Sequence, residues 1–161
     1  MLELFTWLFP VAVSLHNLEE GLSFPRYAHL FAPWRRVHVS AFRFALVLLT
    51  LLAYLSALWS TLGGARSVGA YLHAGYMLTM LLNVLIPHLA VSVAQGRLMP
   101  GTATGVLLVL PTTLTGLYLG LSRSGLEPFP LVRYGGAVTL ALLASLPLLF
   151  KLGALFGNAR T

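Results

Sequence analysis

Three side chains that can bind a metal ion or transfer a proton stand together near the end of the first apolar segment. His16, Glu19 and Glu20 belong to the run His-Asn-Leu-Glu-Glu. Residues i, i+3 and i+4 share one face of an α-helix, so the three side chains project together. A carboxylate costs about 2.5–3.5 kcal/mol at the centre of a membrane helix, and two adjacent glutamates also repel each other. We therefore expect a cation or a proton to compensate for them.

Partners for this helix face are predicted in the third and fourth apolar segments. If the third segment runs from the outside to the inside, His88 lies at the same depth as the two glutamates. Asn83 precedes His88, and Pro87 between them is expected to bend the helix. A Pro-Gly turn starts the fourth segment, where the hydroxyl group of Thr102 or Thr104 caps the helix or contacts a bound group. These polar groups are predicted to meet at one level of the membrane.

Imidazole and carboxylate ligands without thiolates suit zinc, iron or manganese, with zinc the first choice. Two histidines and one glutamate leave coordination positions open, which is typical of a catalytic site. The other glutamate then acts as a general base on water that attacks an ester, amide or phosphoester, while Asn83 orients the substrate. Oxidative iron chemistry on a lipid chain uses the same residues and stays open. The predicted metal ligands are His16, Glu19, Glu20 and His88, and the predicted catalytic residues are Glu20, Asn83 and Thr104.

The composition excludes several classes of protein. Hydrophobic residues make up 58% of the 161 residues and charged residues 9%, with a mean hydropathy of +0.85. This leaves too little polar surface for a water-soluble enzyme. The chain has no cysteine, so disulfides, zinc-thiolate sites and thiol nucleophiles are excluded. The net charge of +6 reflects arginines that flank membrane spans, and no nucleic-acid partner is expected.

The elements that position the site are predicted to be five transmembrane helices in a single all-α membrane domain, residues 1–161. Each is an apolar stretch of about 20 residues or more, the length that crosses a bilayer. Gly and Pro separate the last four stretches. The spans are predicted at about 2–21, 41–62, 67–93, 102–121 and 131–156.

The distribution of basic residues predicts an N-terminus outside and a C-terminus in the cytoplasm. Seven basic residues fall on the expected inner side, namely Arg26, Arg35, Arg36, Arg43, Arg97, Lys151 and Arg160. Three fall on the other side, namely Arg66, Arg123 and Arg133. The long loop 22–40 mixes arginines with aromatic residues, so we expect it to lie on anionic lipid headgroups.

The polar motifs in their order resemble the signature of the HXXEE-domain membrane proteins. The matching positions are His16, Glu19, Glu20, Asn83, His88, Pro100, Gly101 and Thr104. The family comprises small multi-spanning bacterial proteins of unassigned function, suspected from their polar motifs to be enzymes. The resemblance implies a multi-pass protein of the bacterial inner (plasma) membrane and supplies no substrate. From the position of the site in the membrane we expect a small hydrophobic substrate.

Two other classes of function remain open. A transporter or ion relay would use the same His and Glu residues, but the sequence shows no matching polar set on the outer half. A non-catalytic scaffold would pair Glu19 and Glu20 with Arg35 or Arg36. His38 is a further candidate for a ligand or a proton shuttle. His73 lies about 22 Å from His88 by helical rise, so it is expected to be a packed or interfacial residue and not a ligand of the same ion.

Overall fold

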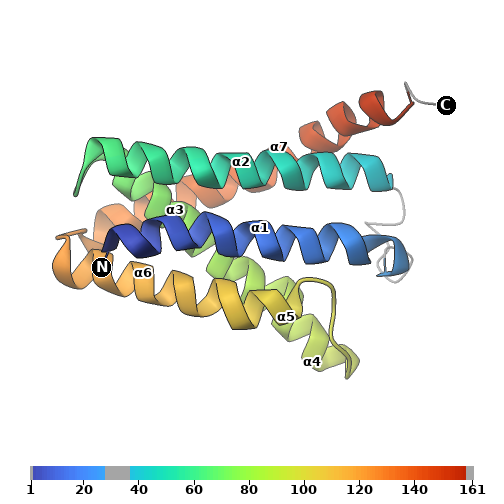
Figure 1. Ribbon diagram of the computed structural model, residues 1–161, viewed down its shortest axis with the longest axis horizontal. Coiled ribbons are helices and arrows are strands. Elements are labelled where there is room, and N and C mark those ends of the chain that lie inside the picture. Colours follow the sequence, from blue (N-terminus) through green and yellow to red (C-terminus); the bar gives the residue numbers. More distant parts are fainter. Residues whose placement is uncertain (1, 28–36, 159–161) are drawn as a thin grey trace.

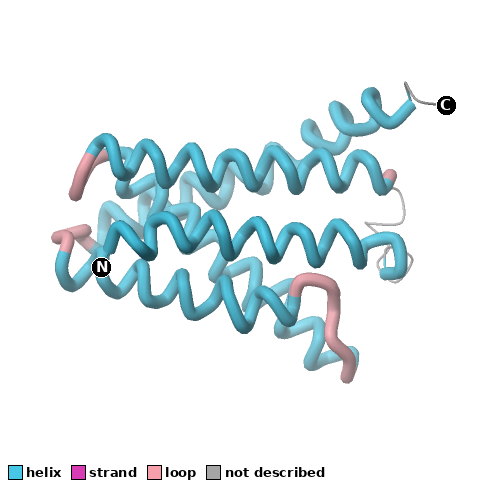
Figure 2. The backbone as a smooth tube through the Cα atoms, in the orientation of Figure 1, coloured by secondary structure: helices cyan, strands magenta, loops and turns pink. Residues whose placement is uncertain are grey.

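A computed structural model of the chain describes residues 2–27 and 37–158, without the side chains of residues 2 and 156–158. In these ranges the chain is helical, and no strand occurs (Figure 2). The helices lie side by side in one bundle (Figure 1). The first helix begins at one end of this bundle, and the last helix ends at the other, where the connection between residues 95 and 102 also lies (Figure 1).

Five long helical units correspond to the five predicted spans. They are α1 (Leu2–Tyr27), α2 (Val39–Gly63), the unit α3 (Val68–Asn83), η3 (Val84–Ala90) and α4 (Val91–Gln95), the unit α5 (Thr102–Thr104), η4 (Gly105–Val109) and α6 (Leu110–Arg123), and α7 (Pro128–Asn158). The segments η3 and η4 are π-helical. The predicted all-α class is therefore confirmed for the described residues.

Four of these units have the length and the apolar character of a membrane span. They cover Val39–Gly63, Val68–Gln95, Thr102–Arg123 and Pro128–Leu155. Helix α1 is 26 residues long but is not among them, because polar and charged residues such as His16, Glu19 and Glu20 interrupt its apolar sequence. The structure thus supports a membrane protein with four such spans, beside which α1 packs against α2 and α6.

The first helix extends beyond its predicted end at residue 21, through Pro25 to Tyr27. Pro25 has no N–H group to donate to the carbonyl group of Gly21, one helical turn earlier. Arg43 of α2 supplies this donor, because its Nε bonds to the Gly21 oxygen at 2.9 Å. A contact with another helix therefore offsets the local effect of proline, and the predicted loop 22–40 begins as helix. Residues 28–36 of that loop lie outside the described ranges.

Small residues bring the helices close together around α3. A Cβ atom added to Gly75 of α3 would lie 3.1 Å from the Cα atom of Gly135 in α7. Such small-residue contacts are common where helices pack inside membranes. The apolar core then fills the space between α1, α3 and the α5–α6 unit with fully buried Phe9, Val13, Val84 and Val109. This core separates the two ends of the bundle.

Candidate metal centre

The predicted polar groups meet between α1, η3 and the start of α5, next to the connection between α4 and α5. The imidazole rings of His16 on α1 and His88 on η3 lie edge to face, with centroids 4.8 Å apart. Glu20 Oε1 lies 3.2 Å from His88 Nε2. His16, Glu20 and His88 each offer one ligand atom, and these atoms all lie within 4.8 Å of one another. The structure therefore brings together the two histidines and one of the two predicted glutamates.

Glu19 lies beside this group in a different arrangement. Its Oε1 accepts a hydrogen bond from the Gly101 N–H group at 3.0 Å, and its Oε2 accepts from the Thr104 N–H group at 2.9 Å. The Thr104 hydroxyl group also donates to Oε2 at 2.6 Å. The first N–H groups of a helix have no partners within the helix, so a carboxylate placed there satisfies them and interacts favourably with the helix dipole. Glu19 thus caps the α5–α6 unit from α1.

A hydrogen bond from its Nδ1 atom orients the imidazole ring of His88. This nitrogen lies 2.7 Å from the carbonyl oxygen of Pro100, which can only accept a hydrogen bond, so Nδ1 carries a proton. In the neutral ring Nε2 then carries a lone pair, which accepts a hydrogen bond from Asn83 Nδ2 at 3.0 Å and lies 3.2 Å from Glu20 Oε1. A metal-binding histidine commonly has this arrangement, in which the other nitrogen donates to a carbonyl oxygen.

The π-helical turn explains why Asn83 and His88 meet. Residues five apart point about 140° away from each other around an ordinary α-helix, which advances 100° per residue. In η3 the i→i+5 pattern brings them onto one face, and the turn contains Pro87. The bend predicted at Pro87 is therefore a π-helical segment, a feature that is frequent at functional sites.

His16 presents its Nε2 atom to the same space. The residue is fully buried, and its Nε2 has no hydrogen-bond partner. Its Nδ1 lies 3.4 Å from the Thr104 hydroxyl oxygen, whose proton is directed to Glu19. This contact places the imidazole proton on Nδ1 and leaves a bare lone pair on Nε2. Burying such an acceptor without a partner costs about 1–3 kcal/mol, so the site has an unfilled bonding position.

The two imidazole nitrogens and the carboxylate suit a divalent ion in their chemistry. A small movement of Glu20 would bring the three ligand atoms to the spacing that such an ion requires. Nitrogen and oxygen ligands about 2.0–2.2 Å from a tetrahedral zinc ion lie about 3.3–3.6 Å apart, somewhat closer than the spacing seen here. Glu20 is the ligand best able to move, because its side chain is flexible and 17% exposed. Two acceptors, Glu20 Oε1 and His88 Nε2, already face each other and require a cation or a proton between them.

Gly101 forms the wall over this group. A Cβ atom there would lie 2.8 Å from Cε1 of both His16 and His88 and 3.0 Å from Cγ of Glu20. Its φ angle of +81° also lies in the region that favours glycine. The Pro-Gly turn therefore does more than connect two spans, because its glycine makes room for the ligand set.

Two polar residues that support the site, Ser92 and Asn17, were not predicted as site residues from the sequence. Ser92 looks like an ordinary small helix residue, but its hydroxyl oxygen accepts from the Met99 N–H group and pairs with Thr102 at 2.7 Å. Asn17 donates to the Leu46 carbonyl oxygen and to Thr50, which attaches α1 to α2. The position of Asn17 inside the His-Asn-Leu-Glu-Glu run was the one available signal.

The remaining predicted residues lie elsewhere. His38 is exposed and contacts Ser40 at 2.8 Å, and it is not part of the ligand group. His73 is buried at the other end of the bundle, as a packed residue, and lines a cavity there. The sequence analysis did not predict this polar cavity, which buried apolar residues separate from the metal centre. The predicted pairing with Arg35 or Arg36 concerns residues outside the described ranges.

Comparison with known proteins gives a family but no activity. Residues 7–115 match the family described as a protein of unknown function with HXXEE motif. The chain is 31% identical over 150 residues to the uncharacterized protein YrkK of Bacillus subtilis (strain 168), an alignment that covers 92% of this chain and 95% of the relative. No solved structure matches the chain. By the extent of both matches, the chain belongs to the family of proteins with an HXXEE motif.

Proposed function

We propose that the chain is a membrane-embedded metal-dependent enzyme whose His16, Glu20 and His88 side chains hold one divalent ion. The observation that carries the proposal is the bare, buried Nε2 of His16 next to His88 Nε2 and Glu20. Two histidines and one glutamate form a ligand set found in catalytic zinc sites, with a position left for water or substrate. Zinc is the first expectation, and iron or manganese follow.

The proposed reaction is hydrolysis of an ester, amide or phosphoester bond in a lipid or another hydrophobic molecule. A bound ion would supply Lewis-acid activation of the carbonyl or phosphoryl oxygen. Asn83 is half-buried and donates to His88 Nε2; a bound ion would take this lone pair, which would release the Asn83 amide group to orient a substrate. Both oxygens of Glu19 accept hydrogen bonds from Gly101 and Thr104, which makes Glu19 a positioning residue. Glu20 is then the carboxylate next to the proposed ion.

The proposed setting is the bacterial plasma membrane, with the site near the cytoplasmic face. Exposed leucines on the outer surface of α7, such as Leu140, Leu143 and Leu148, suit contact with lipid tails. Arg26 and His38, at the described edges of the loop, are exposed and suit contact with anionic headgroups. A substrate would then enter from the inner leaflet.

Metal analysis tests the central claim. The protein is purified in detergent without chelators, and its zinc, iron and manganese contents are measured by mass spectrometry. We expect about one ion per chain, and a loss of at least tenfold in occupancy for Glu20→Gln and for His88→Ala. The matched control is His38→Ala, which removes an exposed imidazole and is expected to keep the ion. Absence of stoichiometric metal, or equal loss in the control, would contradict the proposal.

An assay of metal-dependent lipid cleavage then distinguishes an enzyme from a protein that only binds the metal ion. Vesicles of phospholipid are mixed with the loaded protein, and released fatty acid or headgroup is measured. We expect activity that a chelator removes and zinc restores. For Asn83→Ala we expect a lower kcat at unchanged metal content, because Asn83 is proposed to orient the substrate and is not one of the three residues that would hold the ion.

A cation transporter is the second candidate function, and one observation favours it. The cavity at His73 places a polar group at the other end of the bundle from His88. Buried Phe9, Val13 and Val84 occupy the core between the two ends, so an ion would pass only if these side chains move. Uptake of radioactive zinc into vesicles that contain the purified protein would support transport, and metal-dependent lipid cleavage without uptake would support the enzyme.

A further inference from the structure

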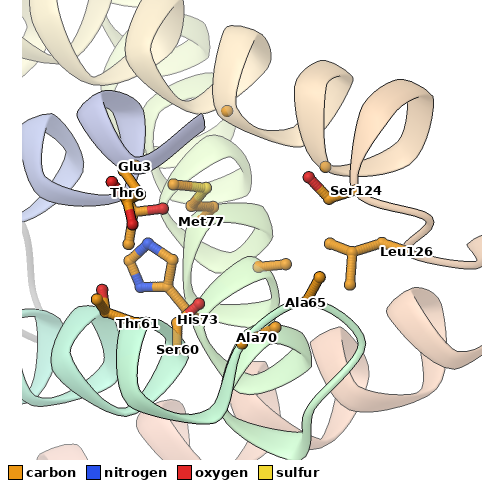
Figure 3. A pocket seen from close by; sticks show the side chains of 14 residues that line it. Glu3, Thr6, Ser60, Thr61, Ala65, Ala70, His73, Met77, Ser124 and Leu126 are labelled. Carbon is orange, nitrogen blue, oxygen red and sulfur yellow. The ribbon is translucent and has the colours of Figure 1, made fainter. Parts of the chain in front are cut away.

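A second polar cavity lies at the end of the bundle opposite the metal centre. It has a volume of about 150 Å³ and is formed by α1, α2, α3, α6 and the turns at that end (Figure 3). Its polar wall comprises Glu3, Thr6, Ser60, Thr61, His73 and Ser124. None of these residues belongs to the ligand group of the metal centre.

His73 is the buried polar group of this cavity. Its exposed fraction is 3%, and its Nδ1 lies 2.9 Å from the Ser56 hydroxyl oxygen. That hydroxyl group donates to the Ala53 carbonyl oxygen at 2.8 Å, so it accepts from His73 and fixes the proton on Nδ1. The Nε2 atom therefore has a lone pair and no hydrogen-bond partner, and neighbouring side chains cover it. Figure 3 shows the imidazole ring facing Glu3 and Thr6.

The charge of the described lining residues is negative. Glu3 is the charged group among them, and neither arginine nor lysine takes part. The Thr61 hydroxyl group donates to the Ala57 carbonyl oxygen, which leaves its lone pairs available. Together with His73 Nε2, these groups form a surface of hydrogen-bond acceptors. Such a surface favours a donor that carries positive charge, and the Arg66 guanidinium lies outside it, at Gly125 between the lining residues Ser124 and Leu126.

The rest of the cavity wall is apolar. Ala70, Ala74, Met77 and Leu126 line it, and the first three come from the buried face of α3. A cavity of about 150 Å³ is large enough for a benzene-sized molecule. The ligand that fits both walls has a cationic donor group at one end and a small apolar body at the other.

We propose that this cavity is a binding site for a small primary ammonium compound with an apolar body about the size of a benzene ring. The ammonium group donates to the Glu3 carboxylate and, once the side chains that cover it move aside, to His73 Nε2, and the apolar body contacts Ala74 and Met77. The site is independent of the proposed enzyme activity, because His73 and His88 are about 22 Å apart along the helical unit by helical rise. It gives the outer end of the protein a recognition function.

Binding of 4-fluorobenzylamine to the full chain in detergent tests the proposal. Fluorine NMR titration gives the Kd, and 4-fluorobenzyl alcohol serves as the neutral probe of similar size. We expect saturable binding of the amine at least tenfold tighter than that of the alcohol. Glu3→Gln is expected to weaken amine binding at least tenfold and to leave alcohol binding within twofold. Equal affinity for the two probes, or no saturable binding, would overturn the proposal.

Two further variants distinguish loss of the binding site from loss of folding. Ala74→Leu fills the cavity without removing a polar group, and we expect it to abolish binding of both probes while the protein stays monodisperse. His88→Ala disables the metal centre and is expected to leave the amine Kd unchanged, so failure of the metal proposal and failure of this one are distinguishable. Amine binding that persists in Ala74→Leu, or that disappears in His88→Ala, would place the probe elsewhere and overturn the assignment.

Discussion

The carboxylate of Glu19 on the first helix accepts hydrogen bonds from both the backbone N–H and the hydroxyl group of Thr104, 85 residues further along the chain. This contact joins the first and fourth helical units next to the imidazole of His16. It divides the two adjacent glutamates by role, because Glu19 holds the helix end and Glu20 faces His88. Their different partners allow the roles to be separated by mutation.

Replacing Glu19 with glutamine should destabilise the protein without removing the metal ligands. The amide NH₂ group would face a backbone N–H donor, so one of the helix-end donors loses its partner, at a cost of about 1–3 kcal/mol. We expect a lower Tm in detergent for Glu19→Gln and a metal content close to that of the wild type. Glu20→Gln should show the reverse pattern. A Glu19→Gln protein with unchanged Tm and no metal would assign Glu19 to the ion.

Gly101→Ala should damage the site more than its backbone strain explains. The φ angle of +81° costs an alanine about 1–2 kcal/mol, and the added Cβ would also lie 2.8 Å from both imidazole rings. Gly96→Ala is the matched control, since φ is +62° and nothing lies within 4 Å of the added Cβ. We expect both variants to lose stability and Gly101→Ala alone to lose the metal. Equal metal contents would show that Gly101 acts only as a turn residue.

The meeting of His16, Glu20 and His88 could be predicted from the sequence for two physical reasons. Helical periodicity places His16 and Glu20 one turn apart, and the apolar lengths of the spans fix the depth of His88. The hydrogen bonds between Glu19 and the start of the α5–α6 unit could not be predicted in this way, because they depend on the fold of the turn before Thr102. That turn is held by Ser92, whose hydroxyl group bonds across it in a way that composition does not indicate.

Two features of the fold needed tertiary contacts that no local pattern contains. The first span is predicted to end at residue 21, yet the helix continues through Pro25, because Arg43 bonds to the Gly21 carbonyl oxygen that proline leaves free. The cavity at His73 needs side chains from several helices and from the turns at that end, so residue spacing along one helix did not reveal it. Local periodicity thus predicted the helices, and contacts between helices decided their ends and the second cavity.

The two histidines of the metal centre should share one tautomer, with the proton on Nδ1. His88 Nδ1 donates to the Pro100 carbonyl oxygen, and His16 Nδ1 lies next to the Thr104 hydroxyl group. Long-range proton–nitrogen NMR spectra of the metal-free protein with labelled histidine would identify the tautomer of each ring. On addition of zinc we expect the Nε2 resonances of both rings to move, while that of exposed His38 stays in place. A proton on Nε2 of either ring, without zinc, would contradict the proposed ligand set.

The orientation of the bundle decides which side of the membrane the metal centre faces, and the absence of cysteine makes it measurable. Single cysteines replace exposed Ala65, in the turn between α2 and α3, and exposed Gln95, at the end of α4 next to the site. The excess of basic residues on the side of Gln95 predicts that this end is cytoplasmic. A membrane-impermeant maleimide should therefore label the Ala65→Cys protein in intact cells and the Gln95→Cys protein only after permeabilisation. Labelling of Gln95→Cys in intact cells would invert the topology and place the proposed substrate in the outer leaflet.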